Sequence, residues 1–261
     1  MYDLDALDRA LAGSIFAGKL HYSPITQSTN SDALAAARKD APHGSVYFAD
    51  EQLAGRGRGN HAWHSAAGEG LYVSVLLRPQ IPAVRLPMLP LAAGLAATEA
   101  IKAVSGLAVD LRWPNDLLLD QRKTGGILVE AQTDANNIAF SVVGIGINVH
   151  QREFAPGLAT PATSLDLEFG KTISRQSLLV SLLESLEHEA FGLCDPTAVE
   201  AIPSRIEQAS TWVHGRKVEV HGPQACTGVT AGLDANGFLL VTTRNGLVQV
   251  QTGGIRAVET S

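Results

Sequence analysis

Cysteine is nearly missing from this chain of 261 residues: Cys194 and Cys226 lie far apart and form no CxxC pattern. A disulfide framework or a cysteine-based zinc site is therefore not expected, and a reducing cytoplasm fits. Long apolar runs are also missing, since none approaches the roughly 18 to 20 residues that span a bilayer. The start of the chain, MYDLDALDRALAG, lacks the basic and apolar regions of a signal peptide.

Clustered positive charge is missing as well. The chain has 20 Lys and Arg residues against 26 Asp and Glu residues, which gives a formal net charge of -6. Because contacts to phosphate groups of nucleic acids need clustered Lys and Arg, a general nucleic-acid-binding role is not expected. Apolar residues make up 45% and charged residues 18% of the chain, as in a normal globular protein. The length allows one large domain, or a large domain with a small one.

The most informative stretch is LRWPNDLLLDQRKTGGILVE, residues 111–130. Pro114 would interrupt the hydrogen bonds of a strand, so it marks a bend between strands or an edge. The pattern after it predicts a buried hairpin. We expect a short strand over 117–119, a polar turn over 120–125 that ends in two glycines, and a return strand over 127–129.

This hairpin carries two charged residues with candidate roles. Lys123 is expected close to the turn, and Asp116 stands at the entrance of the hairpin. Ordinary structural hairpins rarely place Trp, Pro, Asn and Asp consecutively, which favours a functional role. On spacing alone, however, a solvated turn lysine explains Lys123 equally well.

Polar residues crowd the start of an alanine-rich helix in QSTNSDALAAARKD. Ser28, Thr29, Asn30 and Ser31 all have side chains that can cap the free backbone N–H groups of a helix, and we expect one of them to do so. A cap needs a single residue. The remaining side chains at this helix N-terminus are therefore candidates for polar ligand groups.

A glycine-rich basic loop follows the buried strand expected over 45–50. In GRGRG, residues 55–59, glycines alternate with Arg56 and Arg58. Glycines allow backbone N–H groups to approach a ligand closely, and arginines offer planar charged groups for carboxylate or phosphate. The alternative is a solvated basic loop.

Two histidines in the same loop have the spacing of metal ligands. His61 and His64 lie three residues apart, but no third ligand is nearby in the sequence. We therefore interpret them as loop histidines rather than as a metal site.

A third stretch of interest is GIGIN, which contains Gly144, Gly146 and Asn148. A dinucleotide-binding fingerprint needs a third glycine and a following helix, and here the loop over 151–164 follows instead. The glycines are expected to let a nucleotide lie against the strand.

Periodicity predicts the remaining elements. They are an amphipathic helix within 1–20 with Leu4, Leu7 and Leu11 on one face, a half-buried strand over 71–78, and helices over 91–104, 174–193 and 198–208. From Thr211 onward, short alternating strands and turns at 234–237 and 245–246 predict a small barrel. On sequence alone, this barrel could equally be an independent interaction module.

The WPND and RKTGGILVE segments, the GRGRG loop and the GIGIN stretch together closely resemble the catalytic domain of biotin protein ligases, from about Ser28 to the C-terminus. The resemblance implies an α+β protein with a mixed β-sheet flanked by helices, the class II synthetase-like biotin/lipoate ligase fold. It also implies a catalytic domain over 1–209 and an SH3-like β-barrel over 210–261. Because 1–20 is too short for the N-terminal DNA-binding domain of some bacterial relatives, a repressor role is not expected.

The resemblance also implies roles for individual residues. Lys123, Arg56 and Asp116 are expected to be catalytic, with Asp116 either orienting Lys123 or serving as an outer ligand of magnesium. Arg56, Arg58 and Asn148 are expected to bind the nucleotide. His61 stands where the family usually has a further basic residue, so no role is transferred to it. The residues expected to bind biotin are Ser28, Thr29, Asn30, Gln52, Arg56, Gly57, Arg58 and Lys123.

The implied reaction uses ATP, Mg²⁺ and biotin. Biotinyl-adenylate forms first, and biotin then passes to a lysine on the biotin carboxyl carrier domain of an acyl-CoA carboxylase. A cytoplasmic monomer or homodimer that binds neither membrane nor nucleic acid is expected. Two alternatives stay open, namely a lipoate or octanoate ligase of the same fold and a non-enzymatic scaffold built around the C-terminal barrel.

Overall fold

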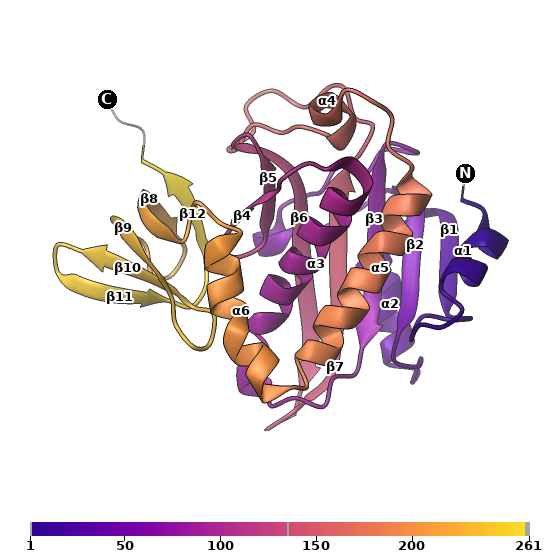
Figure 1. The fold of residues 1–261 in the computed structure, drawn as a ribbon, viewed down its shortest axis with the longest axis horizontal. Helices are drawn as coiled ribbons and strands as arrows, with labels where there is room; N and C mark the ends of the chain where they lie inside the picture. The colour runs from indigo at the N-terminus through magenta and orange to yellow at the C-terminus, as the bar shows by residue number, and fades with distance from the viewer. Residues whose placement is uncertain (1, 135, 259–261) are drawn as a thin grey trace.

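The computed structural model describes residues 2–134 and 136–258, and its largest element is a seven-stranded mixed sheet (Figure 1). The strand order is β1-β2-β3-β7-β6-β5-β4, with β1 parallel to β2 and the other neighbours antiparallel. The strands are β1 (Leu20–Thr26), β2 (Ser45–Gln52), β3 (Gly70–Leu77), β4 (Asp110–Arg112), β5 (Asp116–Leu119), β6 (Arg122–Thr133) and β7 (Ile138–Asn148). The predicted α+β class with a mixed sheet is confirmed.

Helices cover both faces of this sheet. Helices α3 and α5 pack against each other on one face, and α2 lies on the other face against β2 and β3 (Figure 1). The helices are α1 (Leu4–Ala10), α2 (Thr29–Ala37), α3 (Met88–Ser105), α4 (Leu165–Phe169), α5 (Arg175–Gly192) and α6 (Pro196–Gln208), with 3-10 turns at Arg58–Asn60 and Ala83–Arg85. In α1, Leu7 and Leu11 are buried as expected, whereas Leu4 is exposed.

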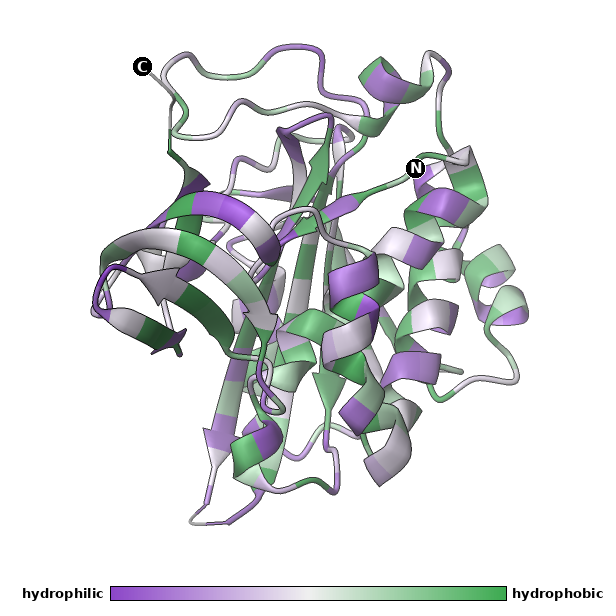
Figure 2. Ribbon diagram, turned by 60° about the vertical axis from the view of Figure 1, so that its left-hand side comes forward, coloured by the Kyte–Doolittle hydropathy of each residue, from purple (hydrophilic) through white to green (hydrophobic). Residues whose placement is uncertain are grey.

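Helix α3 is the central helix of the core. By length and composition it could cross a membrane, which corrects the expectation that the sequence holds no such run. However, 61% of it is buried inside the protein, where Gly94 allows close contact with Leu111 and Ile127. Helix α5 also buries a stripe of leucines, namely Leu178, Leu179, Leu182, Leu183 and Leu186. Figure 2 shows the apolar residues gathered in the sheet and in the helix faces that lie against it.

Strand β3 differs from its prediction in burial. All eight residues of β3 are buried, so the expectation of a half-buried strand is wrong. The alternation itself is present: Val73 and Val75 belong to the main core under α3 and α5, while Leu76 packs in a second cluster with Ala33 of α2. A second helix layer, which a single strand cannot reveal, covers the other face.

The turn of the central hairpin is shorter than predicted. It consists of Asp120 and Gln121, both with positive φ, and β6 begins at Arg122. Lys123 therefore lies on a strand, and the expectation of a turn over 120–125 is wrong. Gly125 also lies in this strand, and a Cβ there would lie 2.7 Å from a Leu117 side-chain carbon, which favours glycine.

The N-terminus of α2 is capped differently from expectation. Ser28 occupies the N-cap position, but within the described part of the chain its side chain makes no capping hydrogen bond. Instead, Oε1 of Gln52 accepts a hydrogen bond of 2.9 Å from the backbone N–H of Thr29. A side chain from strand β2 thus supplies the acceptor, which leaves the Ser28 hydroxyl beside the cavity described below.

The predicted C-terminal strands are confirmed as a second, antiparallel sheet of five strands in the order β11-β10-β9-β8-β12. They are β8 (His214–His221), β9 (Cys226–Leu233), β10 (Leu239–Thr243), β11 (Gly246–Val250) and β12 (Gly254–Ala257). The indole N–H of Trp113 donates a 3.0 Å hydrogen bond to Gly237 O, which ties this sheet to the WPND segment. A domain boundary at residue 209 stays a prediction.

Candidate active site

A cavity of about 770 Å³ lies between the GRGRG loop, the WPND segment and the face of the sheet that carries α2. Its size is in the range of small-molecule sites. Every residue that was predicted to bind or react lines it, namely Ser28, Thr29, Asn30, Gln52, Arg56, Gly57, Arg58, Asp116, Lys123 and Asn148. The structure therefore brings the predicted site residues together, and their individual roles stay predictions.

Lys123 is held between a carboxylate and an aromatic ring. Its Nζ lies 2.5 Å from Oδ1 of Asp116 and 5.5 Å from the centre of the Trp63 ring. Its backbone N–H donates to Pro161 O at 2.7 Å, and its carbonyl accepts from the N–H of Thr163 at 3.0 Å. These contacts rule out the alternative of a solvated turn lysine.

Asp116 is shared by two cations. Burial would raise the pKa of its carboxyl group, but Lys123 and Arg112 outweigh burial and hold this pKa below its usual value. Nη2 of Arg112 lies 2.6 Å from Oδ2, and Lys123 takes Oδ1. Because both carboxylate oxygens are engaged, this geometry fits an orienting role better than a role as a magnesium ligand.

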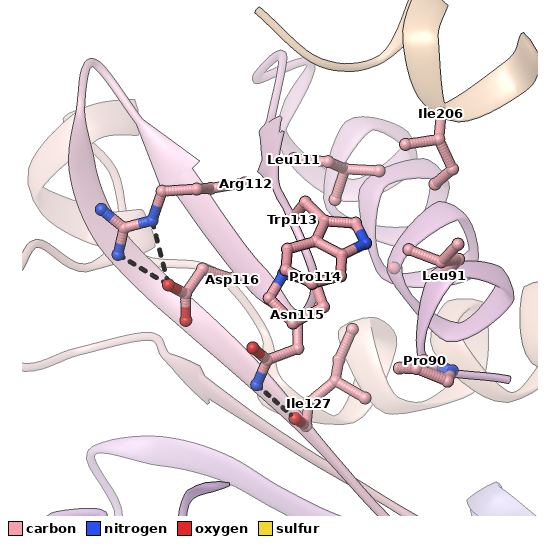
Figure 3. Close-up of a pocket in the computed structure, with 11 residues that line it drawn as sticks. Pro90, Leu91, Leu111, Arg112, Trp113, Pro114, Asn115, Asp116, Ile127 and Ile206 are labelled. Carbon is pink, nitrogen blue, oxygen red and sulfur yellow. Dashed lines mark hydrogen bonds and ion pairs between the residues drawn. The ribbon is translucent and has the colours of Figure 1, made fainter. Parts of the chain in front are cut away.

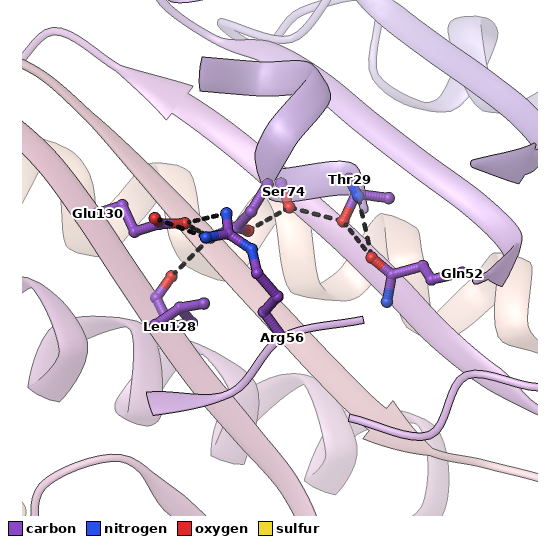
Figure 4. A network of polar contacts seen from close by, with 7 residues as sticks. Thr29, Gln52, Arg56, Ser74, Leu128 and Glu130 are labelled. Atoms are coloured by element: carbon purple, nitrogen blue, oxygen red, sulfur yellow. Dashed lines mark hydrogen bonds and ion pairs between the residues drawn. The ribbon is translucent and has the colours of Figure 1, made fainter. Parts of the chain in front are cut away.

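A chain of hydrogen-bonded polar side chains runs beside the cavity (Figure 4), and its members Thr29, Asn30 and Gln52 line the cavity. Thr29 donates to Gln52 at 3.1 Å and lies 2.7 Å from Ser74, whose hydroxyl donates to Oδ1 of Asn30 at 2.6 Å. The Asn30 amide donates to Oε2 of Glu130 at 2.9 Å. The chain offers donors and acceptors side by side, as a neutral polar ring system requires.

Arg56 is paired with Glu130 at the end of this chain. Its guanidinium makes two parallel contacts, of 2.8 Å and 3.2 Å, to the carboxylate oxygens. The pair is partly exposed, so solvent screens it. A ligand carboxylate or phosphate could therefore compete with Glu130 for Arg56.

Arg58 links the loop to the C-terminal sheet. Its Nη1 donates to Gly253 O at 2.9 Å and to Oδ1 of Asn115 at 3.3 Å. Burial lowers the pKa of its guanidinium, while the nearby Asp116 raises it. Residues 252–256 and His221 also line the cavity. The C-terminal sheet thus forms one wall of the site.

The glycines of the GIGIN stretch make room for side chains from other segments. A Cβ on Gly144 would lie 1.9 Å from Oδ1 of Asn30, and a Cβ on Gly146 would lie 2.6 Å from Nε1 of Trp63. Both glycines also line the cavity, so the approach of a nucleotide to this strand stays a prediction. Asn148 lines the cavity and donates to Thr163 O at 3.0 Å.

Sequence reasoning missed several contributors to this site. Ser74 was given no role, although it joins Thr29 to Asn30. Arg112 was overlooked although it directly precedes the WPND segment, and that position was the available signal. No local signal marked Gly253 as a neighbour of Arg58.

In residues 2–134 and 136–258, no group of three or more His, Cys, Asp or Glu side chains is placed to hold a metal ion. His61 and His64 both line the cavity, without a third such side chain beside them in these ranges.

The fold and the site define a ligand-binding α+β protein with cationic and neutral polar groups around one cavity, as an enzyme that joins an acid to a nucleotide requires. The model of the biotin/lipoate A/B protein ligase family matches residues 22–148. The biotin–[acetyl-CoA-carboxylase] ligase of Mycobacterium tuberculosis is 33% identical over 237 residues, 88% of this chain and 85% of the relative. The chain belongs to the biotin protein ligase family.

Two further comparisons agree with this assignment. The bifunctional ligase/repressor BirA of Bacillus spizizenii is 39% identical over 170 residues, which make up 64% of this chain. This match spans about half of the relative, 52% of its length. The biotin protein ligase of Aquifex aeolicus in complex with biotin and ATP superposes with a TM-score of 0.79 and 28% identity. It covers 93% of this chain and 100% of its own.

One prediction concerns the Arg56–Glu130 pair. Glu130→Gln should raise the rate of tryptic cleavage after Arg56 roughly 1.4- to 5-fold, because a partly exposed ion pair contributes about 0.2 to 1 kcal/mol. The control is Glu99→Gln, which removes an exposed carboxylate from α3. Equal cleavage rates for the two variants would show that the pair does not restrain the loop.

Proposed function

We propose that the protein is an ATP-dependent biotin protein ligase. It would form biotinyl-5'-AMP and transfer biotin to a lysine of a biotin carboxyl carrier protein. One observation carries this proposal: Arg56, Arg58 and Lys123 line the same cavity as the neutral polar side chains of Thr29, Asn30 and Gln52. The cations suit the two anions that must meet, and the neutral side chains suit the ureido ring of biotin.

The first step joins two negatively charged groups. A carboxylate oxygen of biotin attacks the α-phosphorus of ATP, the bond to the β-phosphate oxygen breaks, and pyrophosphate leaves. Repulsion between the reactants must be offset, so fixed positive charge lowers the barrier. Lys123 supplies such a charge at a defined position because Asp116 and Trp63 hold it. The arginines provide charge that does not titrate near neutral pH.

The second step needs access of the carrier lysine to the adenylate rather than further reactive groups from this protein. The amine of a carrier lysine attacks the acyl carbon of the mixed anhydride, and AMP leaves. Neither step needs a nucleophile from this protein, so positioning and electrostatics account for catalysis. The site residues then act by binding and orienting the reactants.

Magnesium would accompany ATP in this scheme and neutralise its phosphates. Mg²⁺ often keeps several waters and binds through substrate phosphates with few carboxylates. That mode agrees with the set of side chains at this cavity, which is rich in cations and has Asp116 engaged by Lys123 and Arg112. The residues that would face the metal-bound phosphates are Arg56, Arg58 and Lys123.

A lipoate ligase is the main rival, because the matching family includes both kinds of enzyme. The dithiolane ring of lipoate has no N–H or C=O groups to pair with Thr29, Asn30 and Gln52, whereas the ureido ring of biotin has both. A buried polar chain left unpaired by its ligand costs free energy. The hydrogen-bonding groups that line the cavity therefore favour biotin.

The test is to incubate the protein with ATP and either biotin or lipoate and to detect the acyl-adenylate by mass spectrometry. We expect biotinyl-5'-AMP with biotin and little adenylate with lipoate. The reverse result would favour a lipoate ligase. If no adenylate forms with either acid, the result would favour a scaffold built around the C-terminal sheet.

Location and partners form part of the proposal. We propose a cytoplasmic location because Cys194 and Cys226 are both free thiols, as a reducing compartment maintains. The partner would be the biotin carboxyl carrier domain of an acyl-CoA carboxylase. A catalytic unit over 1–209, a C-terminal unit over 210–261, and a monomeric or homodimeric state remain parts of this proposal.

A further inference from the structure

Arg112 is a largely buried arginine at the edge of the cavity. It ends β4, and 8% of its side chain is exposed. Its Nε and Nη2 donate to Oδ2 of Asp116 at 3.1 Å and 2.6 Å (Figure 3). Nη2 also donates to Oγ1 of Thr160 at 2.9 Å. With these donors engaged, Arg112 is better suited to hold a neighbouring group than to bind a ligand.

The neighbouring group is Asp116, and its two oxygens have different partners. Arg112 takes Oδ2, whereas Lys123 takes Oδ1 at 2.5 Å. Because a carboxylate is planar, two contacts from Arg112 to one oxygen define where the other oxygen points. Lysine has a flexible stem, so its ammonium group depends on such a partner for its position.

Arg112 is itself held by the C-terminal part of the chain. Its Cζ lies 5.1 Å from the centre of the Trp212 ring, a cation–π contact. Arg216 of β8 also stacks on Trp212, at 3.7 Å, and its Nη2 donates to Oε1 of Gln121 at 2.8 Å. Gln121 belongs to the hairpin turn, two residues before Lys123. Two contacts, one through Arg112 and one through Arg216, therefore connect Trp212 and β8 to the hairpin that carries Lys123.

We propose that Arg112 is a positioning residue for adenylation: it fixes Asp116 so that the carboxylate holds the ammonium group of Lys123 in place, and Trp212 supports Arg112 from the C-terminal side. The proposal rests on the proposed ligase function. It implies that the C-terminal sheet influences the first chemical step through Trp212 and Arg112, in addition to forming a wall of the cavity.

The kinetic test compares Arg112→Gln, Arg112→Lys and the control Arg122→Gln. Arg122 lies in the same hairpin, and its Nη2 pairs with Glu168 at 2.9 Å instead of Asp116. Loss of charge-assisted hydrogen bonds predicts a kcat for adenylate formation that is roughly 10- to 100-fold lower in Arg112→Gln, with KM for biotin and ATP nearly unchanged. Arg112→Lys should fall between Arg112→Gln and wild type, and Arg122→Gln should match wild type.

A second readout is the pKa of Asp116, which can also be measured without catalysis. The charged groups near Asp116 are Lys123 on β6, Arg112 on β4 and Arg58 in the loop. Removing the positive charge of Arg112 destabilises the carboxylate, so the pKa of Asp116 should rise in Arg112→Gln. The acid limb of the pH–kcat profile should then move to higher pH. Carboxyl ¹³C NMR titration measures this pKa directly, and Arg122→Gln should leave it unchanged.

The outcomes separate this proposal from the proposed function. A wild-type protein that makes no adenylate would remove the ligase function, and an Asp116 pKa unchanged in Arg112→Gln would independently overturn the role of Arg112. A loss that appears in KM, or a kcat of Arg112→Gln equal to that of Arg122→Gln, would also overturn it. If Arg112→Gln does not fold, Arg112→Lys decides. A kcat below that of the wild type at unchanged KM supports the proposal, and a kcat equal to that of the wild type contradicts it.

Discussion

Lys123→Met should lower the rate of biotinyl-adenylate formation roughly 100- to 1000-fold, the loss typical of removing one group that stabilises developing charge in a transition state. Methionine keeps most of the length of the side chain and removes its charge. The fold should survive, because Asp116 keeps its 2.6 Å contact with Arg112. Single-turnover mass spectrometry of the adenylate measures the rate, and circular dichroism checks the fold.

The matched control for this change is Lys102→Met, which removes an exposed lysine from the last turn of α3. It should form adenylate at the wild-type rate. If Lys123→Met also retains wild-type turnover while folding normally, Lys123 has no part in the chemistry, and its contact with Asp116 is structural.

Gly144→Ala should weaken biotin binding at least 10-fold and lower the free energy of unfolding by about 1 to 3 kcal/mol. The new Cβ would lie 1.9 Å from Oδ1 of Asn30, so the asparagine must move. Its movement breaks the 2.6 Å hydrogen bond from Ser74 and the 2.9 Å hydrogen bond to Glu130. Isothermal titration calorimetry with biotin and thermal unfolding measure the two effects.

Gly13→Ala is the control, because a Cβ at Gly13 meets no atom within 4 Å and its φ lies outside the left-handed region. This variant should bind biotin like the wild type. Wild-type biotin affinity in Gly144→Ala would mean that the polar chain through Asn30 does not form the biotin site, even if the protein loses stability.

Local patterns in the sequence were sufficient to predict the central hairpin, though not the length of its turn, and to place Asp116 and Lys123 within it. Asp116 and Lys123 lie seven residues apart in one hairpin, so the fold of that segment alone brings them together. The strands of the second sheet were predictable for the same reason, since short alternation and Asn-Gly turns are local signals. The contacts that complete the site are not local.

Contacts between distant segments could not be read from the sequence. Arg56 pairs with Glu130 across 74 positions, and Arg58 reaches Gly253 across 195 positions. Such pairs depend on the order and register of the strands, which no single segment specifies. Strand β1 was missed for a related reason: Pro24 weakens its strand signal, and an edge strand tolerates a proline that a central strand would not.

The most direct test of the proposed reaction is the exchange of labelled pyrophosphate into ATP, which occurs only when adenylate formation is reversible on the protein. With ATP and Mg²⁺, we expect exchange that depends on biotin, is nearly lost in Lys123→Met, and is not supported by lipoate. Exchange that proceeds without biotin, or equally well with lipoate, would contradict the account of this cavity as a site for biotin adenylation.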